Sequence, residues 1–146
     1  MAEVKNRNKS ITKQAQKGIM KNAKEYFNQS ADQWDKPKRV AMAKAVSDAI
    51  RRNVPLSENM TAMEFGCGTG LISMALAPAL KHVLAVDMSE TMLAVLAKKI
   101  ADNQVDNIAP RRLDPASGEL PEQRFDLIFS SMTLHHIKDV DGLFKT

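Results

Sequence analysis

Apolar and polar positions along the chain fall into short blocks that predict alternating strands and helices. Three compact apolar runs have the composition of buried strands. They are Met60–Phe65, Val83–Val86 and Leu127–Phe129, and a further strand is expected in the segment that begins at Ile108. Strands that are apolar on both faces are typical of parallel sheets covered on both sides. The strand pattern therefore favours a parallel sheet.

Between these runs the apolar residues recur at helical spacing, which predicts helices. The helices are expected from Pro37 to about Arg52, over Leu71–Leu80, and from Ser89 onward. The apolar faces of the first and third consist of Val40, Ala43, Val46 and Ile50, and of Met92, Val95, Leu96 and Ile100. Proline suits a first helical turn, and serine suits the capping position before one. The order of elements predicts an α/β fold with a doubly wound parallel sheet and N-terminal helices.

A glycine loop, Gly66-Cys67-Gly68-Thr69-Gly70, joins the first predicted strand to the second predicted helix. Glycine permits positive φ and lets a ligand approach the bare backbone. A helix start adds unpaired N–H groups and a partial positive charge. The loop therefore predicts a cradle for a small ligand, and the alternative is a glycine-rich turn that holds no ligand.

The spacing of the loop distinguishes between ligands. A dinucleotide fingerprint requires a glycine where Leu71 stands, and a phosphate-binding P-loop requires a lysine that does not follow Gly70. Glu64 would repel a pyrophosphate and suits a ligand with a cationic amine. A nicotinamide-dependent oxidoreductase is therefore disfavoured.

The pattern E-x-G-x-G-x-G from Glu64 to Gly70 resembles motif I of the class I S-adenosylmethionine-dependent methyltransferases, which have a Rossmann-like sheet. In that family the loop holds the methionine part of the cofactor, with its ammonium and sulfonium groups. The resemblance implies S-adenosyl-L-methionine as cofactor. The loop residues it implicates in binding are Glu64, Gly66, Cys67 and Gly68.

Asp87 follows the second predicted strand and lies 21 residues beyond Gly66. A carboxylate about 20 residues past a glycine loop lies at the tip of the neighbouring strand and can accept hydrogen bonds from ribose hydroxyls. In the resembling family this acid binds the cofactor ribose, and the next residue, here Met88, packs on adenine. The alternative for Asp87 is a helix cap or a solvated loop acid, although Ser89 is better placed as the cap.

Asp114 follows the third predicted strand, where the resembling family often places an acid that accepts from the adenine amino group. The next family residue commonly offers its backbone N–H to adenine, but Pro115 has none. That contact would then come from elsewhere, for example Ala116. The alternative for Asp114 is a turn-forming Asp-Pro pair.

The segment from Leu120-Pro121 to Phe125-Asp126, with the strand after it, resembles the LP…FD strand of the family. The resemblance implies that the backbone around Ser130 ends beside the sulfonium. In open α/β sheets ligands bind outside the carboxyl ends of strands, and all four proposed contact regions lie at such ends. His135 is a weak candidate for a general base, which the reaction needs only if the acceptor must lose a proton.

Aromatic residues precede the first clear helix. Tyr26-Phe27 and Trp34-Asp35 resemble the leading helix of many small-molecule methyltransferases, in which the tyrosine can close over the cofactor. Tyr26 is therefore a further cofactor-binding candidate. The alternative for Tyr26 and for Trp34 is an aromatic anchor on the core.

Charge is unevenly distributed along the 146 residues. Residues 1–52 carry 13 Lys and Arg against 5 Asp and Glu, whereas residues 53–146 carry 8 against 12. A basic arm can meet a polyanion such as nucleic acid, but the first 24 residues contain no aromatic side chain, which favours a solvated lead-in. We expect a basic lead-in over residues 1–22 and one methyltransferase domain over residues 23–146.

Composition fits an ordinary globular domain, with 44% apolar and 26% charged residues. No apolar run approaches the roughly 18 residues of a membrane span, and no secretory signal is recognisable at the start. Cys67 is the single cysteine, so an internal disulfide is excluded and a cytoplasmic location is expected. Cys67 is interpreted as a small loop side chain rather than a reactive thiol. No metal site is predicted.

The resembling family has seven strands in its sheet, and the sequence predicts four. We therefore expect a chain truncated after the fourth strand, with Leu127 and Phe129 on an uncovered edge that invites self-association. The predicted function is methyl transfer from S-adenosylmethionine to a small-molecule acceptor, with neither nucleic acid nor membrane as partner. No Asn-Pro-Pro-Tyr-like segment follows the fourth strand, which weakly favours a small molecule. The alternative is a non-catalytic cofactor-binding or scaffold fragment.

Overall fold

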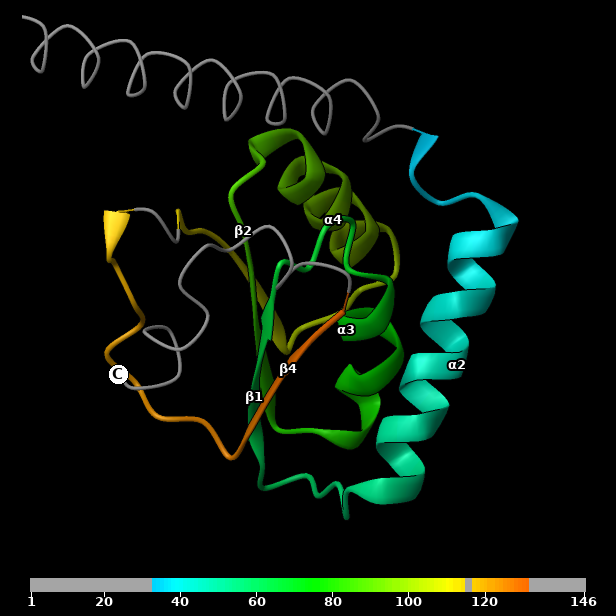
Figure 1. The fold of residues 1–146 in the computed structure, drawn as a ribbon, viewed down its shortest axis with the longest axis vertical. Helices are drawn as coiled ribbons and strands as arrows, with labels where there is room; N and C mark the ends of the chain where they lie inside the picture. Colours follow the sequence, from blue (N-terminus) through cyan, green and yellow to red (C-terminus); the bar gives the residue numbers. More distant parts are fainter. Residues whose placement is uncertain (1–32, 115–116, 132–146) are drawn as a thin grey trace, which may run out of the picture.

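The computed structural model describes residues 33–114 and 117–131, which form a parallel sheet flanked by helices (Figure 1). The strands are β1 (Thr61–Phe65), β2 (His82–Asp87), β3 (Ile108–Arg112) and β4 (Leu127–Ser130). All three strand pairings are parallel, and the spatial order is β3-β2-β1-β4. Along the chain, β2 and β3 are added on one side of β1, and β4 is then added on its other side. This reversal is the hallmark of a doubly wound sheet, so the predicted fold class is confirmed.

The helices begin where the sequence pattern predicts, and one ends earlier. They are α2 (Pro37–Asn53), α3 (Leu71–Leu76) and α4 (Glu90–Asp102). Ser89 caps α4 as predicted, because its side chain accepts a hydrogen bond from the Met92 N–H at 3.3 Å. The prediction of one helix over Leu71–Leu80 is wrong in its second half, which is the 3-10 helix η2 (Ala77–Ala79). Pro78 explains the change, since proline lacks the N–H that would continue an α-helix.

The described helices all cover one face of the sheet. The main core cluster combines side chains of the four strands with those of α3 and α4, and α2 packs on it from outside. Its buried members include Ala62, Val83, Ile108 and Phe129 from the strands and Ile72, Leu76, Leu93 and Leu96 from the helices. The face of α2 is shorter than predicted, because only Ala43, Val46 and Ile50 reach the core while Val40 is 45% exposed.

The other face of the sheet carries a second, smaller core. It consists of Met63, Phe65, Leu84, Val86 and Leu113, with Ala109 and Phe125 packed against it. Within the described part of the connection between β3 and β4 there is no α-helix, and the loop that contains Phe125 covers this face instead. In the described part of the chain, helices therefore cover one face of the sheet, and a loop covers the other.

Strand β4 lies at the edge of the described sheet, as predicted. The expectation that Leu127 and Phe129 are uncovered there is wrong. Phe129 is buried and Leu127 packs against the main core, whereas Ile128 on the opposite face is 55% exposed. Successive strand residues point to opposite faces of a sheet. Leu127 and Phe129 therefore face the helices, and Ile128 faces the other side.

Gly70 of the glycine loop packs closely against Leu96 of the core, and a substitution can test this contact. Its φ is +77°, and a Cβ at this position would lie 2.3 Å from Cδ1 of Leu96, a fully buried side chain. We expect Gly70→Ala to lower the free energy of unfolding by about 2–4 kcal/mol, from overpacking together with backbone strain. Chemical denaturation measures this value.

Gly118→Ala is the matched control for Gly70→Ala. Gly118 has a similar φ of +74°, but a Cβ there would meet no atom within 4 Å. The control therefore carries the backbone strain without the overpacking, and it should destabilise the protein by only about 1 kcal/mol. Equal losses for the two variants would contradict the close packing of Gly70 on Leu96.

Candidate functional site

The glycine loop leaves the carboxyl end of β1 in a conformation that only glycine adopts readily. Gly66, Gly68 and Gly70 have φ values of +70°, +55° and +77°. The loop is tied to the neighbouring strand because the Cys67 N–H donates to the Val86 carbonyl at 2.9 Å. It lies beside the point where the strand order reverses, between β1 and β4, which is where open α/β sheets bind ligands.

Asp87 at the end of β2 connects the loop to the start of α4. One carboxylate oxygen accepts the Gly68 N–H at 2.8 Å, and the other accepts the Ser89 N–H at 2.8 Å. Burial raises the pKa of Asp87, and these backbone N–H groups oppose the rise. Ser89, not Asp87, caps α4 through its side chain. Sequence spacing placed Asp87 near the loop but did not reveal that it holds Gly68 directly.

Glu64 lies beneath the loop and is directed toward α3. Its side chain is buried, with 2% of the residue exposed. One carboxylate oxygen accepts both the Ser73 N–H, at 3.1 Å, and the Ser73 hydroxyl. Burial raises the pKa of Glu64 to about 8, and the negative charge of Asp87 adds to the rise. The carboxyl group thus spans from β1 to the helix that follows the loop.

Cys67 is a buried loop residue and is 7% exposed. Its thiol donates a weak hydrogen bond to the Gly68 carbonyl at 3.5 Å. Burial raises the pKa of the thiol well above its ordinary value, and the nearby acids Glu64 and Asp87 contribute. A thiolate is therefore strongly disfavoured, which supports the small-side-chain interpretation over a reactive thiol.

Ser130 joins the two strands on either side of the reversal point. Its hydroxyl donates to the Phe65 carbonyl at 2.9 Å, so the carboxyl ends of β1 and β4 are held together. Met88 is half-buried directly after Asp87. The structure thus gathers the loop, Asp87, Met88 and Ser130 at one end of the sheet, as the sequence predicts.

Asp114 is half-buried after β3. The Asp114 carbonyl accepts from the Ser117 N–H at 3.1 Å and from the Ser117 hydroxyl at 2.7 Å. This geometry fits the turn-forming alternative for the backbone and leaves the adenine contact a prediction. Tyr26 and His135 lie outside the described residues.

Sequence reasoning missed a group of polar contacts on the loop. Trp34 was interpreted only as an anchor or part of a helix, yet its indole nitrogen lies 3.5 Å from where a Cβ on Gly68 would stand. Asp35 accepts the Thr69 hydroxyl at 2.5 Å. Lys99 on α4 donates to the Thr69 carbonyl at 3.0 Å. The Trp-Asp pair was visible in the sequence, but nothing in the pattern linked Lys99 to the loop.

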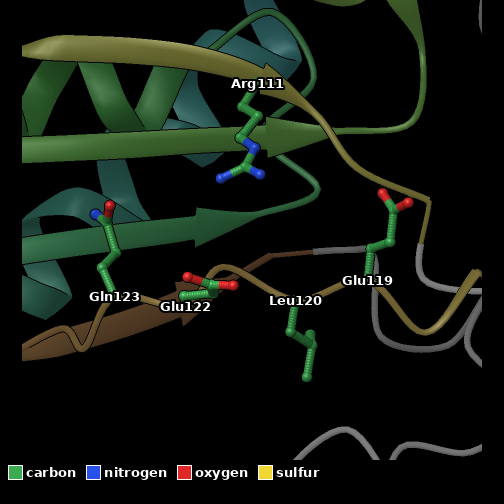
Figure 2. Close-up of a pocket in the computed structure, with 5 residues that line it drawn as sticks. All are labelled: Arg111, Glu119, Leu120, Glu122 and Gln123. Atoms are coloured by element: carbon green, nitrogen blue, oxygen red, sulfur yellow. The ribbon is translucent and has the colours of Figure 1, made fainter.

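A separate hollow of about 640 Å³ opens beside β3 (Figure 2). Arg111 from β3 and four residues from the loop before β4 line it; these are Glu119, Leu120, Glu122 and Gln123. None of the predicted cofactor residues within the described part of the chain lines this hollow. Within residues 33–114 and 117–131 no group of three or more His, Cys, Asp or Glu is arranged to hold a metal ion, and no helix there could cross a membrane.

The buried Glu64 predicts a particular dependence of stability on pH. The folded protein holds the proton up to a pKa of about 8, whereas the unfolded chain releases it near 4.5. The protonated form therefore stabilises the fold fully below pH 4.5, and this contribution is lost as pH rises toward 8.

Glu64→Gln keeps an oxygen that can accept from Ser73 but does not titrate. Between pH 5 and 8 we expect the free energy of unfolding of the wild type to fall relative to this variant, by at most about 1.4 kcal/mol per pH unit. Urea denaturation at a series of pH values measures the difference. Parallel curves for the two proteins would show that Glu64 does not titrate in this range.

Known proteins resemble this chain in both sequence and structure. The profile of a family described as a methyltransferase domain matches residues 62–146, more than half of the chain. The chain is 39% identical over 83 residues to a ubiquinone biosynthesis O-methyltransferase of Coxiella burnetii, across 57% of this chain and 35% of that protein. It is 35% identical over 98 residues to an uncharacterized methyltransferase of Mycobacterium tuberculosis, across 65% of this chain and 45% of that protein.

A solved S-adenosylmethionine-dependent methyltransferase from Mesorhizobium loti superposes on the chain with a TM-score of 0.57 at 34% identity. The match covers 68% of this chain and 45% of that one. The chain thus spans less than half the length of the relatives named here. The family match, the strand order and the glycine loop agree, and the chain belongs to the class I S-adenosylmethionine-dependent methyltransferases.

Proposed function

We propose that the glycine loop and the tip of β2 bind S-adenosylmethionine, and that the protein transfers its methyl group to a small-molecule acceptor. The observation that carries the proposal is the set of carboxylates around the loop. Asp35 bonds to Thr69, Asp87 to Gly68, and Glu64 to Ser73 just beyond the loop. The carboxylate of Asp87 repels a pyrophosphate, and Glu64, which is protonated below a pKa of about 8, becomes a second negative charge when a cation binds nearby, so these surroundings favour a ligand with a positive charge.

The residues at this place fit the chemical groups of the cofactor. Asp87 has two acceptor oxygens at the tip of β2, which suits the neighbouring hydroxyls of a ribose. Gly66 and Gly68 present backbone without a Cβ, which permits close approach of the methionine part. Met88 offers an adaptable apolar surface for adenine, and the backbone at Ser130 closes the side next to β4.

Glu64 is assigned an indirect role. With 2% of the residue exposed and its carboxyl bonded to Ser73, it supports α3 from below the loop. A cation placed at the loop would favour the ionised form of Glu64, because opposite charges attract strongly where water is excluded. Glu64 thereby adds to the preference for a cationic ligand, although its buried side chain does not line the site.

The cofactor supplies an activated methyl group on a sulfonium, which departs as a neutral thioether. The protein must therefore chiefly hold donor and acceptor in line and exclude water. The loop, Asp87 and Ser130 would hold the cofactor in place at the carboxyl ends of the strands. The relative from Coxiella burnetii is named for O-methylation in ubiquinone biosynthesis, which supports a small-molecule acceptor rather than nucleic acid. His135 remains a candidate base for an acceptor that must lose a proton.

Isothermal titration of the chain with S-adenosylmethionine and S-adenosylhomocysteine, with NAD as a comparison ligand, tests the proposed function. We expect heat from both adenosyl ligands and none from NAD. Asp87→Asn should weaken S-adenosylhomocysteine binding about 10- to 100-fold, because a hydrogen bond to a charged group contributes about 1.5–3 kcal/mol.

Asp102→Asn is the control, since Asp102 is an exposed acid that pairs with Lys98 on the surface of α4. Its affinity should equal that of the wild type. Wild-type affinity in Asp87→Asn would remove Asp87 from the site. Absence of heat with either adenosyl ligand in the wild type would overturn the proposal as a whole.

We also propose that the edge of β4 pairs with a second copy of the chain. The strand is hydrogen-bonded to β1 on one side, no described strand pairs with its other side, and Ile128 on the face opposite the helices is 55% exposed. A non-catalytic cofactor-binding module assembled in this way is the alternative function. Sedimentation should show a dimer that Ile128→Lys disrupts, and a monomeric wild type would contradict the pairing.

A further inference from the structure

The short segment before α2 lies against the glycine loop, although the two are more than 30 residues apart in sequence. Trp34 places its indole nitrogen 3.5 Å from the position of a Cβ on Gly68. The adjacent Asp35 accepts the hydroxyl proton of Thr69 at 2.5 Å. Thr69 is 1% exposed, so this hydrogen bond is formed at a buried position between two glycines.

Lys99 completes the contact from a third element, α4. Its ammonium forms an ion pair with the second carboxylate oxygen of Asp35 and donates to the Thr69 carbonyl at 3.0 Å. The Lys99 and Asp35 side chains are only 23% and 32% exposed. Thr69 is therefore held at both its hydroxyl and its carbonyl, by residues that also bind each other.

The preceding residue on α4, Lys98, forms an ordinary surface ion pair for comparison. Lys98 pairs with Asp102 at 2.7 Å within α4, and the two side chains are 78% and 59% exposed. Surface pairs of this kind contribute little. Charge-assisted hydrogen bonds that are partly buried and joined in a network are stronger than such surface pairs, so Asp35, Thr69 and Lys99 form a distinct structural unit.

We propose that Asp35 and Lys99 are positioning residues for the cofactor loop, acting through Thr69. The inference rests on the proposed function of the loop. Glycine on both sides of Thr69 gives the free loop many conformations, and ordering it costs binding free energy. Holding Thr69 at two atoms keeps the loop in one conformation before the cofactor arrives, which lowers that cost.

Trp34 is adjacent to Asp35 in the chain and lies against Gly68, so it reports whether this segment stays on the loop. The guanidinium carbon of Arg39 lies 3.5 Å from the centroid of the indole ring, and the Arg39 side chain also donates to the Trp34 carbonyl at 3.4 Å. The chain has a single tryptophan, so its fluorescence reports on this segment alone. Release of Asp35 from Lys99 and Thr69 should therefore expose Trp34 to solvent, whether or not a ligand is present.

The first test measures acrylamide quenching of Trp34 fluorescence in the full chain without ligand. Lys99→Met removes the ammonium, and Lys99→Arg keeps a charged donor as the conservative rescue. We expect a higher quenching constant and a red-shifted emission in Lys99→Met, and values near wild type in Lys99→Arg. Lys98→Met is the matched control and should match the wild type. Unchanged quenching in Lys99→Met would overturn the proposal.

The second test measures S-adenosylhomocysteine affinity by titration in the same proteins. If the contacts of Lys99 and the binding of the ligand are coupled with a typical free energy, S-adenosylhomocysteine should bind at least about fivefold more weakly to Lys99→Met. The affinity should recover in Lys99→Arg. Thr69→Val and Thr69→Ser provide a second pair, in which only the valine variant should lose affinity. Higher quenching with unchanged affinity would show that the contact exists but does not position the loop, which would overturn the proposal.

The two tests also separate this proposal from the proposed function. Circular dichroism and melting temperature establish that each variant is folded before its affinity is interpreted. Failure of the wild type to bind S-adenosylhomocysteine would reject the cofactor assignment and, with it, the positioning role. The quenching data would in that case still decide whether Asp35 and Lys99 hold the segment against the loop.

Discussion

The hydrogen bond from the Gly68 N–H to the Asp87 carboxylate is the interaction on which the site depends. A loop of alternate glycines has no strong conformational preference of its own, and its conformation must be imposed from outside. Asp87 imposes it from the tip of the neighbouring strand, at 2.8 Å, while its other oxygen binds the start of α4. One carboxylate thus fixes the relative placement of β1, β2 and α4 where they meet the ligand space.

The same arrangement has an electrostatic consequence. Asp35, Glu64 and Asp87 approach the loop region from three elements, and Lys99 is the basic residue bonded to the loop within the described part of the chain. Burial raises the pKa values of Glu64 and Asp87, because their ionised forms are poorly solvated, and Glu64 holds its proton up to a pKa of about 8. A ligand with a positive charge favours the ionised forms, whereas a dianionic pyrophosphate disfavours them. The surroundings of the loop therefore select among ligands that share the same glycine geometry.

Much of the fold could be predicted because its signals are local. Apolar runs located strands β1, β2 and β4, Ser89 and Pro37 located two helix starts, and the 21-residue spacing placed Asp87 near the loop. The errors concern features that are decided by local backbone chemistry or by three-dimensional packing. Pro78 ends α3 early, Val40 is too far from the core to be buried, and the exposed side chain on β4 is Ile128.

The missed contacts at the site have a common physical origin. Lys99 occupies a polar position on an amphipathic helix, where a lysine is ordinarily solvated, and only the three-dimensional arrangement brings it to Thr69. The bond between Glu64 and Ser73 likewise depends on how the helix leaves the loop. Periodicity identifies which face of an element is buried, but it does not identify which polar groups meet across elements.

The most direct test of the account is an amide NMR titration of the ¹⁵N-labelled chain with S-adenosylhomocysteine. The account predicts that chemical-shift changes concentrate at the amides of residues 66–70 and 87–89, where the loop meets Asp87. Chemical-shift changes confined to the residues that line the separate hollow, which are Arg111, Glu119, Leu120, Glu122 and Gln123, with an unchanged glycine loop, would contradict it.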